Sequence, residues 1–355
     1  MTFLEQAGWG SARREAITGD ASFRRYERLQ LGERRAVLMD APGFKEDPSR
    51  ANESAYMQNA ALAVNIAPFV AIDDWLRGLG LGAPEIFSCD IENGLLLLED
   101  LGDLSFGHMV DAKDQRLEDA YDEAVKALVT LHRINIPDSL PVRGGGRHIL
   151  PSYHQKIMQR ELEMLFEWYL PEHLATPLSS REVEAFWQAW NPLLFSQMEG
   201  LTPALLLRDY HTPNLHWRPE RTGASRLGII DFQDALIGSP AHDVMSLLQD
   251  ARKDLPEGFE QRLLQNYLDA RDMDEGFDAE AFLRSYAILG ALRNTRLLGL
   301  WVRLPKRDGK MHYAAHLPRA WRHVEKNLSH PVMAEVQDWM NRVLPPDSRI
   351  REPGE

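Results

Sequence analysis

The sequence predicts an α+β fold with two lobes, a small β-rich lobe at the amino terminus and a large helical lobe after it. Short apolar runs typical of strands occupy much of the first 101 residues. Beyond them, apolar residues recur at steps of three and four, which is the period of an amphipathic helix. We therefore expect two domains, residues 1–101 and residues 102–355.

Four strands and one helix are expected in the small lobe. The helix is expected from about Pro68 to Leu79, and the strands over Arg25–Leu31, Ala36–Asp40, Ile86–Cys89 and Gly94–Leu98. Short apolar runs bounded by turn residues are typical of strands.

The large lobe shows helical spacing in several segments. Apolar side chains repeat with this spacing at Leu117, Tyr121, Ala124, Leu128 and Leu131, and again at Met158, Leu162, Leu165 and Tyr169. A further helix is expected over Glu280–Leu304. Residues 141–147 (PVRGGGR) form the most flexible-looking link, and the tail beyond Pro345 is expected to fray.

Composition and charge exclude several classes of protein. With 355 residues, 44% of them apolar, the chain can bury one large or two medium cores. A formal net charge of -13 disfavours nucleic acid and anionic membranes as partners, because both attract basic surfaces. The single cysteine, Cys89, cannot form an internal disulfide, which favours a reducing compartment. The start has no basic segment followed by an apolar core, and no apolar run approaches membrane-spanning length, so we expect a cytoplasmic protein.

The clearest chemistry lies in two short motifs. The chain reads LRDYHTPN at 207–214 and, after an apolar run, DFQD at 231–234. Asp209, Asn214 and Asp231 are the residue types that metal-assisted phosphoryl transfer requires. One carboxylate accepts the proton of an attacking hydroxyl, while an amide oxygen and a second carboxylate hold Mg²⁺ against nucleotide phosphates. The pattern therefore predicts a kinase.

Each half of this pattern also has a simpler explanation. An aspartate five residues before an asparagine arises by chance, and an aspartate after a strand is commonly a turn or cap residue. The two halves together are more specific, because the apolar runs that flank residues 217–226 look like the strands of a hairpin. Such a hairpin would bring Asn214 and Asp231 to neighbouring positions.

These motifs resemble those of the aminoglycoside phosphotransferase and choline kinase group, relatives of the protein kinases, whose catalytic loop usually reads HGDxHxxN. Asp209, His211 and Asn214 match that loop, whereas Leu207 and Arg208 replace the usual His-Gly. Within the group, the segments GDASFRRY, VLMDAP, LLLEDLGD and IDFQDALIG are most similar to bacterial kinases that phosphorylate the anomeric hydroxyl of N-acetylmuramate and N-acetylglucosamine during cell-wall recycling. The resemblance covers roughly residues 17–300.

The resemblance implies a two-lobe protein-kinase-like fold that uses ATP and Mg²⁺, with the nucleotide bound by the small lobe. A buried strand ending in Glu-Asp-Leu would place the Glu99 carbonyl and the Leu101 amide beside an adenine; a core strand ending in an acidic turn is the alternative. Gly19 and Ser22 belong to the candidate turn over the phosphates, where glycine permits tight bending and backbone amides can face oxygens. An ordinary hairpin turn is the alternative there.

One cation that the resemblance implies is missing. The family's strand normally carries a lysine that contacts the nucleotide phosphates and pairs with a helix glutamate, but this sequence has Met39 there and only apolar residues at 68–72. The absence of the lysine and the absence of its glutamate partner go together, because a buried glutamate without the lysine would be an uncompensated charge. Either the chain is a pseudokinase, or another cation replaces the lysine. We favour the second, with Arg24 or Arg25 as the substitute; as neighbours in a strand they should point to opposite faces.

Substrate recognition is less well specified by the sequence. The residues expected at the substrate are Asp209, Arg208, Asp234, Arg293 and Arg296. The last two share a helix face and would suit a carboxylate such as a lactyl group, although internal ion pairs explain them equally well. We expect a monomer that binds a small sugar and ATP, but no nucleic acid and no membrane. Kinases of aminoglycosides, choline or homoserine, and a nucleotide-binding pseudokinase module, are the alternatives.

Overall fold

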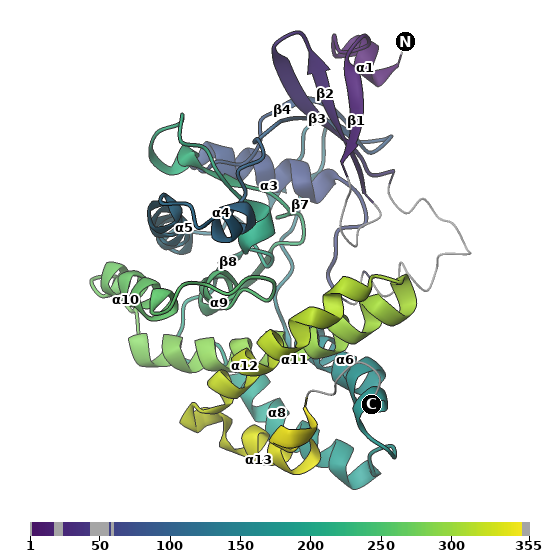
Figure 1. Ribbon diagram of the computed structural model, residues 1–355. Helices are drawn as coiled ribbons and strands as arrows, with labels where there is room; N and C mark the ends of the chain where they lie inside the picture. Colours follow the sequence, from purple (N-terminus) through teal and green to yellow (C-terminus); the bar gives the residue numbers. More distant parts are fainter. Residues whose placement is uncertain (1, 18–23, 43–56, 58–59, 350–355) are drawn as a thin grey trace. The chain divides into compact units, whose positions relative to one another are not determined.

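The computed structural model describes residues 2–17, 24–42, 57 and 60–349 (Figure 1). The chain divides into two compact units. Unit 1 comprises Met1–Ala127, Asn135–Pro151 and Leu207–Leu236, and unit 2 comprises Leu128–Ile134, Ser152–Leu206 and Ile237–Glu355. Both predicted kinase motifs therefore fall in unit 1. The predicted division into two consecutive lobes, with a boundary at residue 101, differs from this division into units and stays a prediction.

Unit 1 is built on a five-stranded antiparallel sheet with the strand order β1-β2-β3-β5-β4. In that order the strands are Arg13–Ile17, Arg25–Leu31, Arg34–Asp40, Leu95–Glu99 and Ile86–Asp90. The predictions for β2, β3, β4 and β5 are confirmed to within two residues. The sequence does not predict β1, because its residues RREAI are all exposed and show no apolar alternation.

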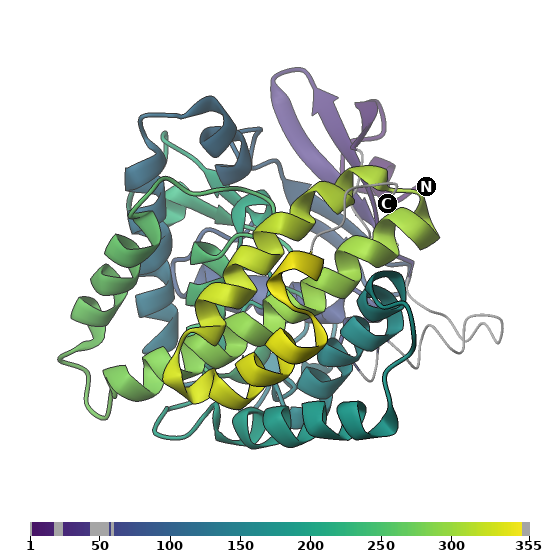
Figure 2. The ribbon, with the colours of Figure 1, turned by 60° about the horizontal axis from the view of Figure 1, so that its bottom comes forward.

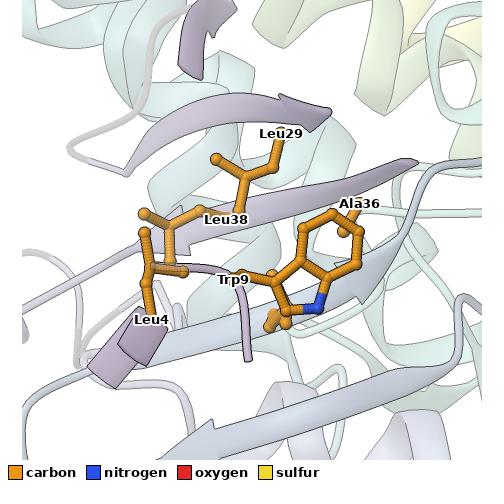
Figure 3. Close-up of a cluster of buried hydrophobic side chains, with 6 residues drawn as sticks. Leu4, Trp9, Leu29, Ala36 and Leu38 are labelled. Atoms are coloured by element: carbon orange, nitrogen blue, oxygen red, sulfur yellow. The ribbon is translucent and has the colours of Figure 1, made fainter. Parts of the chain in front are cut away.

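The two faces of this sheet carry different side chains, because successive residues of a strand point to opposite sides. An apolar cluster covers one face and consists of Leu4, Trp9, Leu29, Ala36, Leu38 and Leu97, all buried (Figure 3). Leu4 comes from the short helix α1 (Phe3–Gln6), which a capping box between Thr2 and Glu5 starts. The other face carries Tyr26 and Met39, which lie directly opposite each other across β2 and β3.

The rest of unit 1 consists of helices, 3-10 turns and short strands. They are α3 (Ala67–Gly78), α4 (Phe106–Ala112), α5 (Leu117–His132, whose end belongs to unit 2), β6 (Leu140–Pro141), β7 (Arg147–His148), η3 (Thr212–Asn214), β9 (Leu215–Trp217), η4 (Gly223–Arg226) and β10 (Leu227–Ile229). Helix α3 confirms the helix predicted near 68–79. The glycine-rich link at 141–147 is folded into the β6–β7 hairpin, where Arg143 donates to Asp74 at 2.8 Å.

Unit 2 is helical. Its elements are α6 (Gln155–Met164), the π-helix η2 (Leu165–Tyr169), α7 (Leu170–His173), α8 (Ser180–Ser196), β8 (Ala204–Leu206), β11 (Leu236–Gly238), α9 (Ala241–Leu248), α10 (Phe259–Arg271), α11 (Ala279–Asp308), η5 (Met311–His316), α12 (Leu317–Leu328), η6 (Pro331–Met333), α13 (Ala334–Val343) and η7 (Pro346–Ser348). Strands β8 and β11 pair with each other. No helix in the described part of the chain is long and apolar enough to span a membrane.

The long helix α11 forms the centre of unit 2 and packs against α12, α9 and α6; Figure 2 shows α11 and α12 side by side. It confirms the helix predicted over Glu280–Leu304 and ends where Gly309 adopts a left-handed conformation. Gly299 permits a close approach, because a Cβ there would lie 2.1 Å from the Met164 carbonyl oxygen. Residues on several sides of α11 are buried, which explains why its apolar residues are not confined to one stripe.

The expectation of a frayed tail is wrong for residues 346–349. Arg349 is buried, and its guanidinium donates to the Leu344 carbonyl at 2.9 Å and to Asn341 at 2.6 Å. The Arg349 carbonyl in turn accepts a hydrogen bond from the Tyr169 hydroxyl. These side-chain and backbone contacts of Arg349 hold the segment against the rest of unit 2, although its sequence has the polar, proline-rich composition of a loose end.

Candidate active site

The catalytic loop at 207–214 is a tight backbone structure. The Asp209 N–H donates to the Leu207 carbonyl at 2.8 Å, and the His211 N–H donates to the Asp209 carbonyl at 3.1 Å. Asn214 closes the loop, because its side-chain amide also donates to the Asp209 carbonyl, at 2.9 Å. The Asp209 side chain stays 36% exposed, with His211 Nε2 at 3.7 Å from its Oδ1. Asp209 is therefore an accessible carboxylate on a constrained loop.

The predicted hairpin exists and joins the two motifs. Strands β9 and β10 pair with Leu215 opposite Ile229, directly after the catalytic loop and directly before the DFQD motif. The Ile230 N–H donates to the Asn214 carbonyl at 3.0 Å. As a result, Asn214 Nδ2 lies 3.4 Å from Asp231 Oδ2. The apolar run at 204–207 is not part of this hairpin, since β8 pairs with β11.

Asn214 and Asp231 fit a divalent cation through oxygen atoms. The Asn214 amide nitrogen is occupied, and within the described residues its amide oxygen accepts no hydrogen bond. The Asp231 side chain is 39% exposed. Mg²⁺ is commonly held by one or two protein oxygens together with substrate phosphates. The described residues contain no cluster of three or more His, Cys, Asp or Glu that could hold a metal.

The electrostatics of Asp231 also favour a cation. Although part of the side chain reaches solvent, the surrounding protein raises the pKa of its carboxyl group, and the neighbouring Asp209 carboxylate raises the pKa further. Gln233 and Arg24 act in the opposite direction: Gln233 Nε2 donates to Asp231 Oδ1 at 2.9 Å. A positive ion between the two carboxylates would relieve their repulsion.

Arg24 and Arg25 have different surroundings. Arg24, immediately before β2, has a side chain only 9% exposed, and its Nη1 lies 3.7 Å from Asp231 Oδ1. Arg25 is 73% exposed on its side chain and pairs with Asp40 at 2.7 Å. Close to Arg24 lies Tyr26, whose burial raises its pKa to about 12 while Arg24 acts to lower it. Of the two candidates for the missing cation, Arg24 is the one beside Asp231.

Met39 occupies the predicted lysine position as a core residue. It is 1% exposed and lies opposite Tyr26 in the sheet. Helix α3 lacks the glutamate that would pair with a lysine, but it contains Asp73, which is fully buried. Neither carboxylate oxygen of Asp73 has a hydrogen-bond partner among the described residues, and burial raises its pKa to about 8. Its place in an apolar helix is the one sequence signal for this buried acid.

The strand end predicted to hold adenine is anchored through side chains. The Glu99 carboxylate accepts hydrogen bonds from Arg218 at 3.1 Å and Arg221 at 2.8 Å, both near the β9–β10 hairpin. Asp100 pairs with Arg28 of β2 at 2.8 Å. The Leu101 N–H makes no hydrogen bond within the part of the chain that the structure describes.

Two predicted substrate residues bind the backbone of unit 1. Arg208 is buried and donates through Nη1 to the Ala60 carbonyl at 3.0 Å. Asp234 accepts the Ala63 N–H at 2.6 Å through Oδ1. Sequence reasoning missed this use of both side chains, because nothing in the pattern links residues 60–63 to the kinase motifs.

The two arginines of unit 2 that were predicted to contact the substrate differ in their burial and their hydrogen bonds. Arg293 is 5% exposed, and its Nη1 donates to the Gln249 carbonyl at 3.5 Å. Arg296 is partly exposed and has no hydrogen bond or ion pair with any described residue.

Gly19 and Ser22, expected in the turn over the phosphates, lie outside the described residues.

The comparisons with known proteins agree with this geometry. Residues 13–283 match the phosphotransferase enzyme family, and the chain belongs to that family. A curated N-acetylmuramate/N-acetylglucosamine kinase of Caulobacter vibrioides is 36% identical over 357 aligned positions, covering 98% of this chain and 96% of that one. A protein of the same name from Pseudomonas aeruginosa is 30% identical and covers 93% of this chain and 89% of its own length.

Solved structures show the same fold at low sequence identity. The GDP complex of an aminoglycoside 2'-phosphotransferase-IIIa has a TM-score of 0.55 and 15% identity, covering 92% of this chain and 97% of that chain. A choline/ethanolamine kinase family protein from Mesorhizobium loti has a TM-score of 0.52 and 14% identity, covering 95% of each chain. The predicted α+β, kinase-like fold is confirmed.

Proposed function

We propose that this chain is an ATP- and Mg²⁺-dependent kinase that phosphorylates the anomeric hydroxyl of N-acetylmuramate and N-acetylglucosamine, giving the sugar 1-phosphate. The observation that carries the proposal is the Asn214 side chain, whose amide nitrogen lies 2.9 Å from the Asp209 carbonyl and 3.4 Å from the Asp231 carboxylate. One side chain thus joins the proposed base to the proposed metal ligand. The curated relatives are named as kinases of N-acetylmuramate and N-acetylglucosamine, and the proposed acceptor sugars are taken from those names.

In this proposal Asp209 orients the anomeric hydroxyl and accepts its proton. That hydroxyl is more acidic than the other hydroxyls of a sugar, which suits a single carboxylate as base. Asn214 and Asp231 hold Mg²⁺, which when bound neutralises charge on the nucleotide phosphates. Arg24 adds a fixed positive charge beside Asp231.

The remaining nucleotide contacts are assigned to the small sheet. The Glu99 carbonyl and Leu101 amide hold adenine, and Gly19 and Ser22 remain candidate phosphate contacts on sequence grounds alone. Arg296 is the arginine we assign to the lactyl carboxylate of N-acetylmuramate, because it lacks a partner among the described residues. We further propose that the enzyme is a cytoplasmic monomer of cell-wall recycling that binds no nucleic acid.

A second candidate, a nucleotide-binding pseudokinase, rests on one observation. Met39 is buried where the family's lysine would stand, so the site lacks its usual phosphate contact. Retention of Asp209, Asn214 and Asp231 around one hydrogen-bonded amide favours the active enzyme instead.

The test is incubation of the purified chain with ATP, Mg²⁺ and either sugar, followed by coupled ADP release and ³¹P NMR of the product. We expect an acid-labile 1-phosphate that is no longer a reducing sugar. The 1-O-methyl glycosides are the matched control, because the nucleophile is blocked while every other hydroxyl is present, and they should be inert. A reducing 6-phosphate, or turnover of kanamycin, choline or homoserine alone, would contradict the proposal. ATP binding without turnover of any acceptor would favour the pseudokinase.

A further inference from the structure

Most of the described non-glycine residues with a left-handed backbone lie in or next to the candidate active site. In the described part of the chain, the non-glycine residues with positive φ are Ala61, Lys113, Arg208 and Asp231, with φ of 50°, 49°, 69° and 63°. Lys113 ends helix α4 as an ordinary left-handed cap. Arg208 and Asp231 belong to the kinase motifs, and Ala61 lies between Ala60 and Ala63, whose backbones are hydrogen-bonded to those motifs. Left-handed backbone is unfavourable for a residue with a Cβ, so it persists only where surrounding contacts hold it.

Two hydrogen bonds join the kinase motifs to a single turn, residues 60–63. Arg208 donates to the carbonyl of Ala60 at 3.0 Å, and Asp234 accepts the N–H of Ala63 at 2.6 Å. The turn at 60–63 is therefore bonded to the residue before Asp209 and to the last residue of DFQD. These bonds join parts of the sequence that are 148 and 171 residues apart.

The link continues from Asp234 to Asp231. Gln233, 4% exposed, donates from Nε2 to Asp231 Oδ1 at 2.9 Å and to Asp234 Oδ2 at 3.3 Å. Beside it, Phe232 stacks on Phe69 of α3, with ring centroids 4.8 Å apart. Displacement of Asp234 would therefore disturb a network that includes the proposed metal ligand.

We propose that the turn at 60–63 is a clamp that fixes the catalytic loop relative to the DFQD loop, with Arg208 and Asp234 as positioning residues. The proposal rests on the roles assigned above to Asp209 and Asp231. It replaces the expectation that Arg208 and Asp234 contact the sugar. Arg208 stands where the related kinases usually have glycine, so this chain accepts an unfavourable φ in order to place a guanidinium on Ala60.

The test compares Arg208→Gly and Asp234→Ala with wild type. Glycine adopts the left-handed backbone freely, so Arg208→Gly removes the guanidinium without adding strain. We expect each variant to lower kcat by about 10-fold or more, the order of one lost hydrogen bond to a charged group, with the KM for the sugar nearly unchanged. The double variant should lose less than the product of the two effects, because both bonds hold one turn. Asp234→Asn should recover part of the loss, since its amide oxygen can still accept the Ala63 N–H.

Hydrogen exchange of the ligand-free protein gives a readout that does not depend on activity. Amides at 207–214 and 231–234 should exchange faster in both variants, while the β1–β2 region is unchanged. Arg116→Gly, which removes an exposed arginine bonded to Asp114, is the control and should alter neither kcat nor exchange at the site. A loss of melting temperature with normal kcat per folded molecule, or a rise in sugar KM alone, would overturn the clamp. An inactive wild type with the expected exchange pattern would instead count against the proposed function.

Discussion

Arg24 lies beside Asp231, with its Nη1 3.7 Å from the carboxylate oxygen Oδ1 and a side chain only 9% exposed. A residue at the edge of the small sheet thus brings positive charge to the proposed metal ligand. Arg24 comes immediately before β2, which pairs with β3, the strand that carries Met39 at the predicted lysine position. We infer that one arginine, reaching the site from the start of β2, compensates for the lost lysine.

Arg24→Ala should raise the KM for ATP by about 10-fold or more, the order expected for a lost charge-assisted contact to phosphate. Arg25→Ala is the matched control, because Arg25 is exposed and pairs with Asp40, and it should leave the KM unchanged. Met39→Leu should be nearly silent, since Met39 only packs in the sheet. Steady-state kinetics at saturating sugar would check all three. If neither arginine variant alters ATP use, the replacement cation lies elsewhere.

Asp209→Asn should lower kcat by about 10² to 10⁴, the usual contribution of a positioned acid–base group. Folding and ATP binding should be nearly intact, because the backbone bonds of the loop do not use the Asp209 carboxylate. Coupled ADP release and calorimetric ATP titration give the two measurements. A variant with more than half of wild-type turnover would show that Asp209 is not the base.

Asn214→Ala and Asp231→Ala should each weaken binding of Mg²⁺–ATP, and the double variant should lose much less than the sum of the two free-energy changes. The reason is that both side chains hold one ion, so removing the second ligand affects a site already broken. Calorimetric titration of ATP with and without Mg²⁺ tests this. Unchanged metal dependence in Asp231→Ala would exclude it as a ligand.

Asp73→Asn should remove a pH dependence of stability. The pKa of Asp73 is about 8 in the folded protein and that of an unfolded aspartate is about 3.9, so the folded state holds a proton that the unfolded state releases. Its contribution to stability is fully present below about pH 4 and is lost as pH rises through about 8. Relative to the variant, the free energy of unfolding of wild type should therefore fall by up to about 1.4 kcal/mol per pH unit in that window.

Urea denaturation of both proteins at pH 5, 7 and 9 measures this difference. Asp74→Asn is the control, because Asp74 is a partly exposed neighbour paired with Arg143, and it should not remove the slope. Parallel pH profiles for wild type and Asp73→Asn would mean that Asp73 is ionised in the fold.

Arg296→Ala should raise the KM for N-acetylmuramate by about 10-fold while leaving that for N-acetylglucosamine nearly unchanged, because only the first sugar carries a lactyl carboxylate. Arg293→Ala should lower stability without changing the preference, since Arg293 is buried and bonded to Gln249. Kinetics with both sugars separate the two effects. Equal changes of KM for both sugars would remove Arg296 from carboxylate recognition.

The sequence by itself determined the strands β2 to β5, the helix α11 and the chemistry of the two kinase motifs. These features are local: apolar periodicity reports which segments form strands or helices, and residue type reports which atoms can accept a proton or hold a cation. The hairpin that joins Asn214 to Asp231 could also be predicted from the sequence, because its strands follow each other closely in the chain.

Only the tertiary structure decided how the ambiguous residues are used. It distinguished Arg24 from Arg25, buried Arg293 while leaving Arg296 partly exposed, and bonded Arg208 and Asp234 to the turn at 60–63. The partners of Arg24, Arg208 and Asp234 are more than 100 residues away in the sequence, and the burial of a charged side chain depends on which elements pack around it. No short-range pattern records that, so identical residue types next to each other in the sequence take different roles in the fold.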